Sequence, residues 1–175
     1  IFARLPTFIS YILSRTHVFS ATYLKARIHN LVEQRKRLQQ IYCQTLFSPK
    51  SEKKSVKEEN MPVLSVSDQK FMDKLIQTIT ENMDNCDFSV DNMALSVDMS
   101  RSNFFRKLKG ITGQSPIDFL KQMKMKRALQ LIESKEYNIS EIAYMVGFND
   151  AHYFSKCFKQ TYGISPTEYK NNIDR

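Results

Sequence analysis

The sequence predicts an all-α protein whose C-terminal part repeats one helical motif, and three observations support this. Glycine and proline are scarce, with four Gly and five Pro in 175 residues, whereas β folds with tight turns need more turn residues. Apolar residues recur at helical spacing from Ser67 to the C-terminus. Two C-terminal segments also match each other at a nearly constant offset. At 42% hydrophobic residues, the chain can bury a core.

The internal repeat relates residues 88–119 to residues 137–169. The offset is 49 residues in the first part of each copy and 50 in the second, so the second copy has one extra residue near 148–149. The matched pairs include Ala94 with Ala143, Phe104 with Phe154, Arg106 with Lys156, and Ser115–Pro116 with Ser165–Pro166. So many matches at one offset indicate two copies of one structural unit.

Each copy is expected to form a short helix, a tight turn and a second helix. Ser89 and Asn138 suit the start of the short helices, and Gly147 suits a positive φ at the turn. The second helices are expected to begin after Ser100 and Asp150 and to end at Gly113 and Gly163; their buried faces carry Phe104, Leu108, Phe154 and Phe158. The sequence therefore predicts two helix-turn-helix motifs.

A long helix is expected to join the two motifs, from Ser115 to about Ser134. At about 20 residues it would be about 30 Å long, close to the roughly 34 Å repeat of the major groove of B-DNA. Such a helix could place two recognition helices in adjacent turns of one groove. Lysines on it, Lys121 and Lys124 among them, are expected to face phosphates.

The charge distribution supports a nucleic-acid partner without proving one. The chain has a formal net charge of +8. Residues 1–60 carry +7, residues 61–99 carry −5, residues 100–127 carry +7 and residues 128–175 carry −1. A basic block in an otherwise acidic region is typical of a one-sided nucleic-acid surface, although a solvated helix face would show the same charge.

Two stretches, SRSNFFRKLKGITGQSPIDFLK and ISEIAYMVGFNDAHYFSKCFKQTYGISPTEY, resemble the AraC/XylS-type transcriptional regulators. The resemblance implies a seven-helix, two-subdomain DNA-binding domain over residues 67–175. It implies base-facing roles for Ser102, Phe105 and Arg106 in the first motif, and for Ala151, His152, Ser155 and Lys156 in the second. Residues flanking these faces are expected to contact the DNA backbone: Arg101, Asn103, Lys107, Lys109, Tyr153 and Lys159, together with Lys121 and Lys124.

Several of these residues have a second interpretation. Arg106 can form paired hydrogen bonds with guanine, or contact phosphate or solvent. Phe105 can contact a thymine methyl or lie at the edge of the core, and His152 can contact DNA or lie on the surface. Cys43, Cys86 and Cys157 form no metal-binding pattern, and no catalytic motif is recognisable. We expect no enzyme, no cofactor, no metal and no small-molecule site.

The N-terminal zone divides into three segments. Residues 1–18 are apolar, but their longest uncharged run is too short to span a bilayer. Residues 19–44 carry a heptad-like stripe and resemble the last helix of a response-regulator receiver, whereas residues 45–66 are polar and read as a linker. We therefore expect the C-terminal part of a response regulator or hybrid two-component protein, in which the 19–44 helix is also a candidate for dimerisation.

The sequence thus predicts a cytoplasmic, sequence-specific transcriptional regulator, whose parent could be membrane-anchored if it is a hybrid sensor. Promoter DNA is its expected partner. RNA polymerase and a second copy of the chain remain open as further partners. The alternative is a helical protein–protein adaptor that does not bind DNA.

Overall fold

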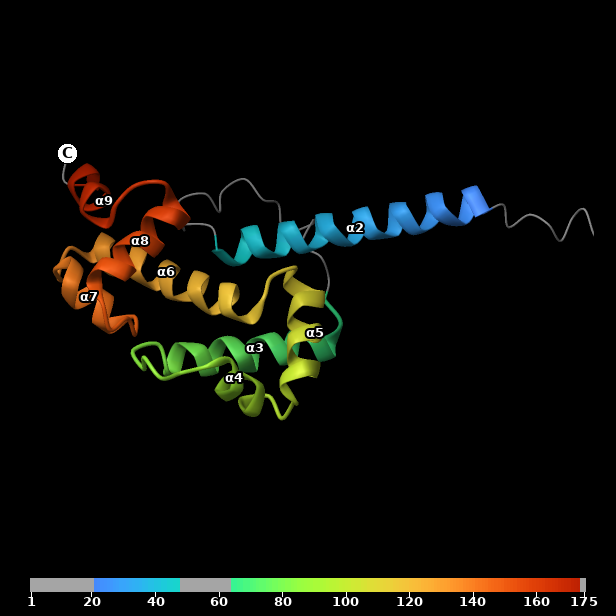
Figure 1. Ribbon diagram of the computed structural model, residues 1–175, viewed down its shortest axis with the longest axis horizontal. Helices are drawn as coiled ribbons and strands as arrows, with labels where there is room; N and C mark the ends of the chain where they lie inside the picture. The colour runs from blue at the N-terminus through green and yellow to red at the C-terminus, as the bar shows by residue number, and fades with distance from the viewer. Residues whose placement is uncertain (1–20, 48–63, 174–175) are drawn as a thin grey trace, which may run out of the picture. The chain divides into compact units, whose positions relative to one another are not determined.

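The computed structural model describes residues 21–47 and 64–173, and every regular element in them is a helix (Figure 1). This confirms the predicted all-α class. The helices are α2 (Ala21–Phe47), α3 (Val66–Glu81), α4 (Val90–Ser96), α5 (Arg101–Thr112), α6 (Pro116–Ser134), α7 (Ile139–Met145), α8 (Ala151–Tyr162) and α9 (Pro166–Ile173). The seven helices α3–α9 correspond to the predicted two-subdomain region.

The chain forms two compact units, residues 1–38 and residues 39–175. In the first unit the described part is the helical stretch of α2 from Ala21 to Leu38, and its side chains are exposed. The second unit holds the rest of α2 and helices α3–α9. Both helices that flank the predicted 45–66 linker extend into it, because α2 continues to Phe47 and α3 begins at Val66. No helix in the described residues is both long and apolar enough to cross a membrane.

Local capping explains where most of the helices begin. Ser89 and Asn138 each form a capping box, with Asn92 and Glu141 respectively, which satisfies otherwise unpaired amides at the first turns of α4 and α7. The hydroxyl of Ser115 accepts from the amide of Asp118 at the start of α6, ahead of Pro116. Ser65, which lies before the predicted start of the domain, caps α3 through the amide of Asp68.

The turns inside the two motifs share one backbone conformation. Gly147, after α7, has φ +70°, the left-handed conformation predicted for it. In the first motif the corresponding turn contains Asp98 at φ +57°, a conformation that aspartate tolerates better than most residues. Its carboxylate pairs with Lys74 of α3 at 2.9 Å. The shared geometry is consistent with the repeat seen in the sequence.

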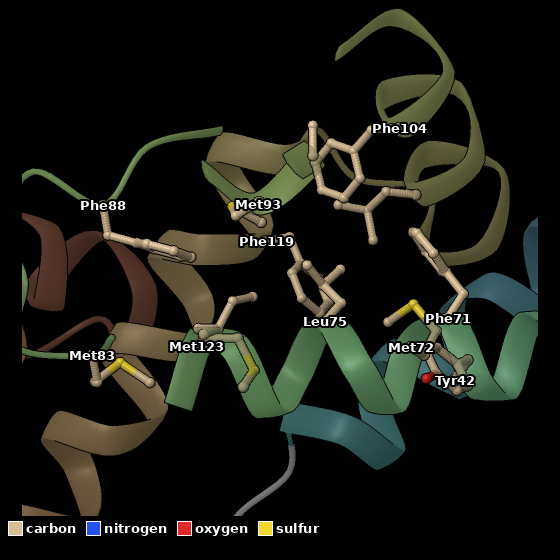
Figure 2. Packing of buried hydrophobic residues seen from close by; sticks show 13 residues of the cluster. Tyr42, Phe71, Met72, Leu75, Met83, Phe88, Met93, Phe104, Phe119 and Met123 are labelled. Atoms are coloured by element: carbon tan, nitrogen blue, oxygen red, sulfur yellow. The ribbon is translucent and has the colours of Figure 1, made fainter. Parts of the chain in front are cut away.

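Two separate hydrophobic cores lie on either half of α6. The first contains Phe71, Leu75 and Phe104 and includes Phe119 and Met123 from α6 (Figure 2). The second contains Phe154 and Phe158 and includes five residues of α6: Met125, Ala128, Leu129, Leu131 and Ile132. Tyr42, near the end of α2, is buried in the first core. The connecting helix is therefore shared by two subdomains that otherwise bury their side chains separately.

Candidate nucleic-acid interface

Helix α5 is buried on one side and exposed on the other, as the repeat predicted. Phe104 and Leu108 are fully buried in the first core, which fixes the rotation of the helix. Ser102, Asn103 and Arg106 are exposed. The guanidinium of Arg106 donates to the side-chain oxygen of Asn103 at 2.5 Å, one helical turn away. This hydrogen bond orients the guanidinium on the exposed face.

Phe105 extends this exposed face. Its side chain is 41% exposed, and the ammonium of Lys109 lies 5.7 Å from the centre of its ring. A cation over an aromatic ring stabilises both groups at a surface. Of the two interpretations open from the sequence, this exposure favours a contact surface over a position in the core. Phe105, Arg106 and Lys109 therefore form one apolar and basic patch.

Helix α8 repeats this arrangement with different chemistry. Phe154 and Phe158 are fully buried, whereas His152, Lys156 and Lys159 are exposed. Ala151 is half-buried. The hydroxyl of Ser155 is half-buried too and donates to the carbonyl of Ala151 at 2.8 Å, so its own helix already uses that donor.

Tyr153 adds an aromatic group to the exposed side of α8. It is 57% exposed and lies 5.9 Å from the ring of Phe148 in the preceding turn. At the start of α8, the carboxylate of Asp150 accepts from the amides of His152 and Tyr153, at 2.8 and 3.2 Å. The cap and the ring contact together fix the first turn of the helix.

Two of the backbone candidates on α5 form ion pairs within the domain. Arg101 pairs with Asp91 of α4, at 3.0 Å for its closest oxygen, but stays exposed. Lys107 pairs with Asp68 of α3 at 3.2 Å, with its side chain 28% exposed, and its ammonium lies over the ring of Phe71. The Ser65 hydroxyl and then the Lys107 ammonium hold the pKa of Asp68 below its usual value. The charge of Lys107 is therefore largely compensated.

The connecting helix departs from the sequence expectation at one residue. Lys121 is half-exposed and donates to Gln160 of α8 at 3.2 Å. Lys124, expected to contact phosphate, is instead buried at 7% exposure and donates to the carbonyl of Gly147 at 3.0 Å. Burial lowers the pKa of Lys124. We therefore remove Lys124 from the candidate phosphate contacts, because α6 turns it toward the interior.

Sequence reasoning also missed a polar contact at the C-terminal end of α5. The last carbonyls of a helix lack partners within it. The side-chain amide of Gln39, in α2, donates to the carbonyl oxygens of Lys109 and Gly110, at 3.3 and 2.8 Å. The thiol of Cys43 donates to the carbonyl oxygen of Thr112 at 3.0 Å. The only signal in the sequence was Tyr42 at the end of the heptad stripe, a residue of the same helix that is buried in the first core.

Comparison with known proteins identifies the family to which this architecture belongs. Residues 93–172 match a family described as a helix-turn-helix domain. The C-terminal domain of AraT, a response regulator from Geobacillus stearothermophilus, is 31% identical, with 63% of this chain and 88% of that chain covered and a TM-score of 0.56. The chain belongs to the AraC-type helix-turn-helix family.

Other relatives of this AraC-type domain give it context. The DNA-binding domain of AdpA, solved in complex with a target DNA, is 26% identical; 58% of this chain and 90% of that chain are covered, with a TM-score of 0.54. Histidine kinase P4 of Formosa agariphila is 32% identical over 153 residues, which cover 87% of this chain but 10% of that protein. The chain spans between 10 and 36% of the lengths of the first curated relatives.

Proposed function

We propose that this AraC-type domain binds promoter DNA in a sequence-specific manner and regulates transcription, with α5 and α8 in adjacent segments of the major groove. The observation that supports it most is the repeated exposed face, which carries Arg106 on α5 and Lys156 on α8 at equivalent positions. Helix α6 joins the two motifs with 19 residues, about 28 Å of helix. That length suits the groove repeat of about 34 Å.

The exposed residues divide into two proposed roles. Base contacts are assigned to Ser102, Phe105, Arg106, Ala151, His152, Ser155 and Lys156. Arg106 is expected to contribute most to base recognition, because a guanidinium can donate two hydrogen bonds to guanine. Backbone contacts are assigned to Arg101, Asn103, Lys107, Lys109, Lys121, Tyr153 and Lys159. Lys107 is expected to contribute least to phosphate binding, because Asp68 already pairs with it.

We also propose that an upstream phosphorylation module controls this domain. The match to AraT, named as a response regulator, and the match to Histidine kinase P4 over most of this chain both support it. One of these relatives is named as a response regulator and the other as a histidine kinase. The cytoplasm is the expected location, because promoter DNA lies there in bacteria.

In vitro selection of bound DNA followed by footprinting tests the DNA-binding proposal. The selected site should be protected over two adjacent groove segments, about 20 base pairs. Arg106→Ala should lower the preference for this site by about 1–3 kcal/mol, and Lys156→Ala should also lower it. Gln77→Ala, on the exposed side of α3, serves as the matched control and should leave the preference unchanged. Binding to the selected site no tighter than to random duplex would contradict the proposal and favour the protein–protein adaptor.

We also propose that the chain forms a homodimer through α2. A contact with RNA polymerase is a separate expectation. Leu24, Ile28, Leu31 and Leu38 are each about half exposed and recur at heptad spacing, with Arg35 interrupting the stripe. Tyr42 continues the stripe but is buried in the first core. The part of the stripe that is exposed for dimerisation therefore ends at Leu38. Light scattering of the full chain should show a dimer that Leu31→Ser disrupts; equal monomer masses at high concentration would contradict it.

A further inference from the structure

A polar contact joins the middle of α6 to the second helix-turn-helix motif. There the buried ammonium of Lys124 donates to the carbonyl oxygen of Gly147, in the turn between α7 and α8, at 3.0 Å. The ammonium also lies 5.6 Å from the centre of the Phe148 ring in the same turn. A buried charge without partners is costly, so these contacts hold the lysine against the turn. Lys124 therefore fixes the turn that leads into α8 to the connecting helix.

A third segment reaches the same point from the first subdomain. A Cβ built on Gly147 would lie 2.6 Å from the Lys124 Nζ atom, 2.7 Å from the carbonyl oxygen of Met83 and 3.1 Å from that of Asn85. Both carbonyls belong to the connection between α3 and α4, and the Met83 side chain is buried in the first core. Three segments converge where only a residue without a side chain fits.

The space beside this contact is not filled by side chains. An open cavity of 680 Å³ lies there, lined by Ile76 and Thr80 of α3, Leu131 of α6 and Met145 of α7 among others. Close packing normally fixes how two elements sit together. The space between α3 and α7 is open, so side chains do not close the gap between the two subdomains at this place. The two subdomains are held together by the shared helix α6 and by the approach of the α3–α4 connection to the turn at Gly147, which Lys124 holds in place.

Building on the proposed function, we propose that Lys124 is a positioning residue that sets the orientation in which α8 enters DNA relative to α5. Helix α6 fixes the distance between the two motifs and the second core packs the second motif against α6, while the Lys124–Gly147 contact holds the turn that leads into α8 to the same helix. A rigid pair favours operators with one spacing, because binding of one recognition helix places the other in register. One inserted base pair turns the second half-site by about 35° and shifts it by about 3.4 Å.

Lys124→Met tests the inference in the full chain, because it keeps the length of the side chain but removes the donor. Affinity is measured on the selected operator, on the same operator with one base pair inserted between half-sites, and on each half-site alone. The wild type should reject the insertion. The variant should bind the selected operator about tenfold more weakly and tolerate the insertion, with half-site affinities within about twofold of the wild type. An unchanged ratio between the two operators, or an equal loss on half-sites, would overturn the inference.

A second pair of variants separates this role from a general loss of folding. Gly147→Ala and Gly163→Ala both place a Cβ at a positive φ, +70° and +82°, but the alanine at 163 meets nothing within 4 Å. Only Gly147→Ala should change the ratio between the two operators, and that ratio does not depend on the fraction of folded protein. Equal ratios in both variants would overturn the inference. Failure of the wild type to prefer its selected operator would instead contradict the proposed function itself.

Discussion

At the scale of single residues, two neighbouring lysines on α5 differ in how their charge is used. Lys109 is exposed, and its ammonium lies over Phe105 on the side of α5 that carries Arg106. Lys107 faces α3, where Asp68 and the ring of Phe71 surround its ammonium. Both were equivalent phosphate candidates in the sequence, because one turn of helix does not show which neighbour a long side chain meets. From these surroundings we propose that Lys109 contacts DNA, whereas Lys107 acts mainly within the domain.

We expect Lys109→Met to change the salt dependence of DNA binding and Lys107→Met to change mainly the stability of the domain. Lys109→Met should reduce the slope of log affinity against log salt by about one, because one phosphate contact releases about one counterion. Lys107→Met should change the slope much less but lower the free energy of unfolding by about 0.5–1 kcal/mol. Salt titrations of DNA binding and urea unfolding measure the two effects. Equal slopes for the two variants would contradict this division of roles.

At the scale of elements, the start of the second helix differs between the two motifs. Ser100 occupies the N-cap position of α5, as predicted, but its side chain makes no capping hydrogen bond. Asp150, at the equivalent position of α8, accepts from two amides, and its charge also suits the N-terminal end of a helix. The repeat therefore supplies a natural pair in which one position is capped and the other is not.

Alanine at these two positions should have unequal effects on stability. Asp150→Ala should lower the free energy of unfolding by about 1 kcal/mol, the usual cost of losing an N-cap. Ser100→Ala should change it little, because no hydrogen bond is lost. Chemical denaturation of the two variants beside the wild type measures the difference. A loss at Ser100 as large as that at Asp150 would show that the Ser100 hydroxyl has a capping role after all.

The elements also show which features could be predicted from the sequence. The helices of the two motifs, the long α6 and the buried Phe104 and Phe154 followed from periodicity, caps and the repeat, all of which act within a few residues. The partners of Lys124 and Gln39 did not. Gly147 is 23 residues from Lys124, and Gly110 is 71 residues from Gln39. Such contacts depend on how helices pack, which one sequence does not specify at the level of single side chains.

At the scale of the whole second unit, the domain consists of two cores that share one helix. Phe104 and Phe154 are equivalent in the repeat and fully buried, yet they belong to different clusters. Helix α6 supplies Phe119 and Met123 to one core, and to the other it supplies Met125, Ala128, Leu129, Leu131 and Ile132. A defect in one core should therefore remain local, although unfolding of α6 would expose both cores.

Phe104→Leu and Phe154→Leu test whether the cores are independent. Each variant should lower the free energy of unfolding by about 1–2 kcal/mol, the usual cost of an altered core side chain. Because the two rings share no contacts, the double variant should lose the sum of the two losses within about 0.5 kcal/mol. Hydrogen exchange should show faster opening of α4 and α5 in the first variant and of α7 and α8 in the second. A coupling energy well above that limit, or loss of protection throughout the domain in either single variant, would mean that α6 makes the two subdomains unfold as one.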